Sequence, residues 1–99
     1  MVRPIKMEEE LTSRSRRFWY GLFALLDADK ARAASSDHPI VIPFDSFYSL
    51  AMDDKSMWIF EVGDPSNKCS IKRNQKDDFP YCKLLDWYLK ESYINHISR

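Results

Sequence analysis

A chain of 99 residues with 44% hydrophobic composition is long enough for one compact domain and too short for two. Its 15 basic and 15 acidic side chains cancel, so no overall field draws it toward nucleic acid or a lipid surface. The sequence has two glycines, Gly21 and Gly63, which excludes the glycine-rich phosphate loops and dinucleotide fingerprints. We therefore expect a single domain over residues 1–99.

The N-terminal segment lacks the apolar core of a secretory signal, and no apolar run is long enough to cross a membrane. Both observations predict a cytoplasmic protein without membrane contact. In such a reducing compartment, Cys69 and Cys82 are expected to be free thiols rather than a disulfide.

Residues 8 to about 34 carry the clearest helical pattern. Their apolar side chains recur at three- or four-residue spacing: Leu11, Phe18, Leu22, Leu25 and Leu26, widened by Trp19 and Phe23. The glutamates at positions 8–10 suit the positive end of the helix dipole in or just before a first turn. The helix is expected to end before Pro39, which disfavours helical angles in the residue that precedes it.

Short β-like runs occupy residues 40–72. Residues 40–42 are β-branched and stop at Pro43, as at a sheet edge. Residues 47–52 alternate with period 2, although Asp45 as an N-cap would also permit a helix there. Residues 57–62 form the clearest strand. Turn formers at 63–67 then lead to a weaker strand at 68–72, whose lysines suit an edge.

A second helix is predicted to begin at Asp77 or Asp78, with Pro80 in its first turn, where a missing N–H costs nothing. Short turns join consecutive strands, which favours antiparallel pairing. The predicted fold is α+β, a small antiparallel sheet of three to four strands flanked by N-terminal and C-terminal helices.

The balanced charge conceals an acidic centre between two mildly basic ends. Residues 36–65 contain one lysine against six acidic side chains, whereas residues 66–99 contain seven basic and four acidic ones. We predict that Asp53, Asp54 and Asp64 form an acidic rim that orients a basic partner, an effect mainly on association rate.

Two basic clusters support an alternative, a nucleic-acid-binding protein. Arg14 and Arg17 lie beside the aromatic run at 18–20, and the weak strand carries or adjoins Lys68, Lys72 and Arg73. Basic side chains hold phosphates, and exposed rings stack on bases. A solvated helix face and a lysine-protected sheet edge would leave the same pattern, and these structural explanations are the commoner ones.

No catalytic or metal-binding constellation emerges. Cys69 and Cys82 are thirteen positions apart, and His38 and His96 are isolated, unlike the ligands of a zinc site. Cys82 near the start of a helix could have a lowered pKa, but a buried cysteine that packs as a small hydrophobe is commoner. We predict no enzymatic activity, no metal and no cofactor.

The sequence contains three tryptophans, five tyrosines and six phenylalanines, more rings than so small a core can enclose. Exposed apolar patches mark interfaces, and tryptophan and tyrosine are frequent binding hot spots. The predicted interface anchors are Trp19, Phe23, Trp87 and Tyr88. We predict a protein-binding module, such as a small inhibitor, immunity-type or adaptor protein, with a second copy of the chain as the other candidate partner.

Overall fold

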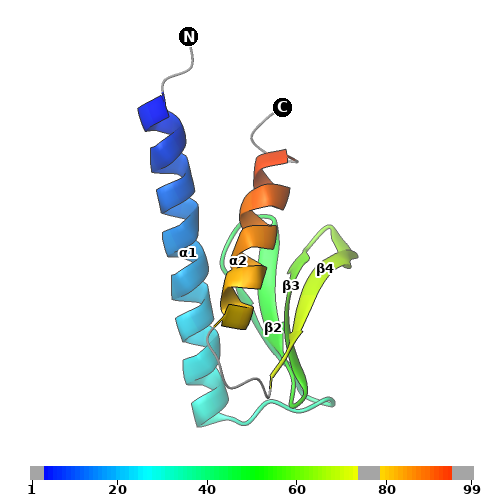
Figure 1. Cartoon of the computed structure of the whole chain (residues 1–99). Coiled ribbons are helices and arrows are strands. Elements are labelled where there is room, and N and C mark those ends of the chain that lie inside the picture. The colour runs from blue at the N-terminus through cyan, green and yellow to red at the C-terminus, as the bar shows by residue number, and fades with distance from the viewer. Residues whose placement is uncertain (1–3, 74–78, 95–99) are drawn as a thin grey trace.

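Along the chain, a four-stranded meander lies between an N-terminal and a C-terminal helix (Figure 1). The computed structural model describes residues 4–73 and 79–94, with side chains over 11–73 and 81–94. The elements are α1 (Pro4–Ala31), β1 (Ile40–Pro43), β2 (Tyr48–Met52), β3 (Ser56–Glu61), β4 (Asp64–Lys72) and α2 (Phe79–Ser92). All neighbouring strands pair antiparallel in the order β1-β2-β3-β4. The predicted α+β fold is confirmed.

Helix α1 begins and ends earlier than the sequence pattern predicts. It starts at Pro4, because proline is already set to helical angles at a first helical position. The glutamates at 8–10 therefore lie beyond the first turn. Helix α1 ends at Ala31, and the Ala34 amide then donates to Asp29 Oδ1 at 2.9 Å, so a side chain accepts the hydrogen bond that another helical turn would have supplied.

Residues 48–52 form a strand, and the helical alternative for this segment is wrong. Asp45 does not cap a helix; its Oδ1 accepts the Phe47 amide at 2.9 Å, which closes a tight turn before β2. The turn predicted over residues 63–67 is also shorter than expected, because β4 already begins at Asp64. Pro65 is tolerated there since β4 is an edge strand and proline lacks a ladder donor. In α2, Pro80 is the second residue, as predicted; Asp77 and Asp78 lie outside the described residues.

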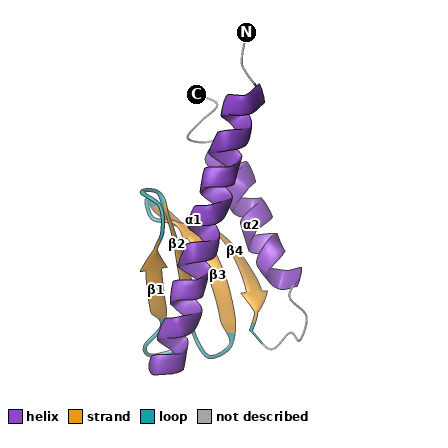
Figure 2. Cartoon of the chain, turned by 90° about the vertical axis from the view of Figure 1, so that its left-hand side faces the viewer, coloured by secondary structure: helices purple, strands orange, loops and turns teal. Residues whose placement is uncertain are grey.

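Both helices lie on the same face of the sheet (Figure 2). The core between them is formed by side chains that are at most 2% exposed: Phe18, Leu22 and Leu25 of α1, Tyr48, Leu50 and Met52 of β2, Met57 and Ile59 of β3, and Leu84 and Tyr88 of α2. Because strand side chains alternate between faces, the intervening residues of each strand point to the other side. Within the described residues, no helix covers that side.

Gly21 allows α1 to approach the segment between β1 and β2. A Cβ at position 21 would lie 2.7 Å from the Cβ of Phe44 and 3.5 Å from Leu50 Cδ1, and the first distance is well inside the carbon contact range. The absence of a side chain at Gly21 thus lets Phe44 and the adjacent Asp45 lie close to α1. In this position Asp45 contacts both α1 and α2.

Candidate binding surfaces

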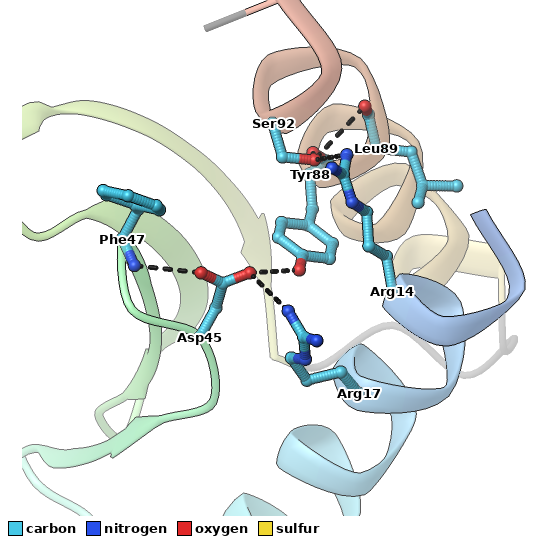
Figure 3. Close-up of polar contacts among 7 residues, drawn as sticks. All are labelled: Arg14, Arg17, Asp45, Phe47, Tyr88, Leu89 and Ser92. Atoms are coloured by element: carbon cyan, nitrogen blue, oxygen red, sulfur yellow. Dashed lines mark hydrogen bonds and ion pairs between the residues drawn. The ribbon is translucent and has the colours of Figure 1, made fainter. Parts of the chain in front are cut away.

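A half-buried carboxylate, that of Asp45, joins three parts of the chain (Figure 3). Asp45 Oδ2 accepts hydrogen bonds from Tyr88 Oη of α2 at 2.5 Å and from Arg17 Nη1 of α1 at 3.2 Å. Burial alone would raise the pKa of Asp45. The hydrogen bonds from Tyr88 and from the Phe47 amide, together with the charge of Arg17, outweigh burial and hold the pKa below its usual 3.8.

Tyr88 belongs to the core, so its predicted role as a surface anchor is wrong. The side chain is fully buried. Its ring packs against Phe44 with centroids 5.0 Å apart and against Tyr48 at 5.4 Å. Burial and the neighbouring Asp45 carboxylate both raise the pKa of Tyr88. A tyrosine can be buried in this way because its hydroxyl has a partner.

Three of the five residues predicted to contact nucleic acid hold the fold together. Arg14 is buried and donates to Ser92 Oγ at 2.8 Å, which links α1 to α2. Arg17 is bound to Asp45 as described above. Arg73 donates to the Asp29 carboxylate and, at 2.9 Å, to the Asp53 carbonyl. Because Arg14 is buried, the predicted phosphate contact is wrong for this residue. Arg17 and Arg73 keep 47% and 28% of their side chains exposed, and their role in nucleic-acid binding stays a prediction.

The predicted acidic rim is divided between two ends of the sheet. Asp53 and Asp54 precede β3, and Asp64 follows it, so about 20 Å of strand separates the two groups. Their carboxylates also serve local structure: Asp53 accepts the Lys55 amide at 2.8 Å, Asp54 accepts the Ser36 hydroxyl at 3.1 Å and Asp64 accepts the Ser66 hydroxyl at 2.6 Å. These residues do not form one rim.

The first candidate surface lies along α1. Phe23 is 55% exposed, and its ring centroid lies 6.2 Å from that of the half-buried Trp19. Beside Trp19 runs an open groove of about 420 Å³, which we call the helix groove. It is lined by Leu11, Thr12, Ser15, Arg16 and Trp19 of α1 and Leu89 of α2. Two of the predicted anchors, Trp19 and Phe23, are thus adjacent.

Trp87, the remaining predicted anchor, packs against the sheet rather than against Trp19 and Phe23. The ring is half-buried and sits edge-on against Tyr48 with centroids 5.8 Å apart. Part of its surface is therefore used within the fold, between α2 and the sheet.

The second candidate surface is the uncovered side of the sheet, which we call the open sheet face. We define it by Val41, Phe47, Trp58, Phe60, Lys68 and Lys72. In the strand register, one row runs Val41–Ala51–Trp58–Ser70, and the next runs Pro43–Ser49–Phe60–Lys68. Val41 and Phe47 are 49% and 47% exposed. This face combines aromatic rings with lysines. Among the described residues, no helix packs over it.

Sequence reasoning did not select Trp58 and Phe60, although the signal was present. Met57 and Ile59 alternate with these two rings along β3, so only one pair can face the core. The sequence predicts the alternation but not which side the helices cover. Both helices cover the side of Met57 and Ile59, which leaves the two rings on the open sheet face.

Other chemistry has little support in the part of the chain that is described. No group of three or more histidine, cysteine, aspartate or glutamate side chains there is placed to hold a metal ion. Cys69 and Cys82 are free thiols; Cys82 is exposed rather than buried, and burial raises the pKa of Cys69. His38 is exposed, and His96 lies outside the described residues. None of the described helices is long and apolar enough to span a membrane.

No protein family matches the chain, and no curated protein or solved structure matches it either.

Proposed function

We propose that this protein is a non-enzymatic protein-binding module that docks an amphipathic helix of its partner in the helix groove. The observation that carries the proposal is the aromatic pair of the half-buried Trp19, which lines the groove, and the exposed Phe23 beside it. Their spacing of four residues places both rings on one flank of α1. In helix-in-groove recognition, the apolar face of a partner helix packs against such a surface.

The rim of the groove indicates the charge of the partner. Arg16 lines the groove and is exposed, and no ion-pair partner for it is found among the described residues. Leu11 and Leu89 supply the apolar floor. We expect the partner helix to insert large apolar side chains and to place a carboxylate near Arg16, which would favour one orientation.

This mode of action suits an inhibitor or adaptor, because the protein contributes a surface and no catalytic step. Binding in a groove between two packed helices requires no rearrangement of the sheet. We place the protein in the cytoplasm on the sequence argument given above. A second copy of the chain could supply the docking helix, and the experiment below separates this case from that of a different protein.

The proposal is tested by selecting from a displayed library of amphipathic helical peptides against the folded chain. We expect enriched peptides to carry acidic residues and to lose about tenfold or more in affinity when Phe23 or Trp19 becomes alanine, as at interface hot spots. Tyr20→Ala is the matched control, because this ring is 67% exposed on the same helix, whereas the Phe23 ring lies 6.2 Å from that of Trp19, which lines the groove.

The absence of enrichment, or equal binding by the Phe23→Ala and Tyr20→Ala variants, would contradict the proposal. Light scattering of the purified chain distinguishes self-association. If the chain forms a dimer that Phe23→Ala dissociates, the partner in the groove is a second copy.

A further inference from the structure

We propose that the open sheet face is a second, independent site that binds single-stranded nucleic acid. Trp58 and Phe60 would stack on bases, and Lys68 and Lys72 would contact phosphates. The site shares no residue with the helix groove, so the two proposals can fail separately.

The rings are placed as a stacking surface requires. Trp58 and Phe60 are two positions apart on β3, so their Cα atoms are about 7 Å apart and their side chains share a face. Their register partners on β2 are the small residues Ala51 and Ser49. Both small residues are buried, Ala51 at 0% and Ser49 at 3% exposure, so the partly exposed rings beside them form the outer surface of this face. Aromatic stacking accepts any unpaired base, since every base has a π-face.

The charges on the same face are those a phosphate backbone needs. Lys68 pairs in register with Phe60, and Lys72 pairs with Ser56, so the two ammonium groups lie along the edge strand β4 beside the rings. Both lysines are exposed, and neither has an ion-pair partner among the described residues. The two rows that contain Trp58 and Phe60 include no acidic side chain.

A single strand fits this face better than a duplex does. Two lysines can neutralise few phosphates, whereas duplex binding without base contacts depends on many. Stacking on Trp58 and Phe60 requires bases that are not already paired. The salt dependence should therefore be shallow, with most of the affinity supplied by the rings.

The test is fluorescence anisotropy with labelled oligothymidine and oligouridine of about 12 nucleotides, and with a duplex of the same length. We expect binding to both single strands and weaker binding to the duplex. For two phosphate contacts, the slope of log K against log salt between about 50 and 200 mM should be about −1.4. Trp58→Ala and Phe60→Ala should each weaken binding about tenfold.

Matched variants separate the site from general effects on the chain. Lys68→Ala should reduce the magnitude of the salt slope by about 0.7, whereas Lys83→Ala, an exposed lysine on α2, should leave it unchanged. Phe23→Ala should leave oligonucleotide binding intact. If Trp58→Ala fails to fold, as judged by circular dichroism, the exposed pair Lys68→Glu and Lys72→Glu tests the same site.

Three results would overturn the proposal. The first is no anisotropy change at about 50 mM salt with protein in large excess over the oligonucleotide. The second is binding that neither the ring variants nor the lysine variants weaken. The third is a dimer that dissociates on Trp58→Ala, because a second copy of the chain would then cover the face.

Discussion

The hydroxyl of Tyr88 donates to the carboxylate of Asp45 at 2.5 Å, across 43 positions of sequence. Arg17 binds the same carboxylate oxygen, so one aspartate holds α1, α2 and the loop before β2 at a single point. The same contact accounts for the burial of an ionisable side chain, because charged and hydrogen-bonded partners replace the water that Asp45 loses.

Asp45→Ala is expected to lower the free energy of unfolding by about 2–4 kcal/mol. The substitution removes a charged acceptor and leaves the buried Tyr88 hydroxyl without it, and hydrogen bonds to charged groups contribute about 1.5–3 kcal/mol each. Urea denaturation measures the change. Asp54→Ala is the control, because Asp54 is exposed and accepts one exposed hydroxyl. Equal effects of the two substitutions would show that Asp45 does not join the elements energetically.

Acidification should destabilise the fold from about pH 3.8 downward. The pKa values of Asp45, Asp29 and Asp53 are all lower in the folded chain than their usual 3.8. The unfolded chain therefore binds protons first as the pH falls. The contribution of these three carboxylates to the free energy of unfolding is fully present above pH 3.8, and it is lost as the pH falls through their lower pKa values in the folded chain. Thermal denaturation across this range measures the decline. Asp45→Asn should flatten it, and an unchanged profile would contradict the assignment of Asp45.

Local patterns in the sequence are sufficient to predict most of the secondary structure. The apolar spacing around Phe18, the β-branched run at residues 40–42 and the alternation around Ile59 each depend on neighbours a few positions away. These signals gave both helices and the antiparallel strands. They do not predict the start of α1 at Pro4 or the early start of β4 at Asp64, because the apolar spacing begins later in the helix and the turn formers at 63–67 conceal the strand.

The candidate sites could be predicted only in part, because they depend on contacts between distant segments. Trp19 and Phe23 share a helix flank, which spacing alone predicts. Tyr88 appeared to be a surface anchor because its partner Asp45 is remote in sequence. The position of Trp58 on the open sheet face depends on both helices packing on the other side of the sheet, which no local pattern encodes.

Gly21→Ala is expected to destabilise the fold by up to about 2 kcal/mol. Alanine favours the helix by about 1 kcal/mol over glycine, but its Cβ would meet the Cβ of Phe44 at 2.7 Å, and such overpacking costs about 1–3 kcal/mol. Phe44 Cβ is fixed to the backbone and cannot swing away. Chemical denaturation of Gly21→Ala beside Ala24→Gly, an exposed position on the same helix, separates the two effects. A more stable Gly21→Ala variant would show that the loop can move.

Arg14→Ala should reduce stability without changing the salt dependence of oligonucleotide binding. Its guanidinium is buried and donates to Ser92 Oγ at 2.8 Å, while that hydroxyl donates to the Tyr88 carbonyl at 2.6 Å. Loss of this link between α1 and α2 is expected to cost about 2 kcal/mol, measured by urea denaturation. The salt slope should stay at the wild-type value, because a buried guanidinium releases no counterions from a phosphate. Arg16→Ala is the control, since this arginine is exposed on the same helix and its loss should leave stability nearly unchanged. A shallower slope for Arg14→Ala with unaltered stability would restore Arg14 as a phosphate contact.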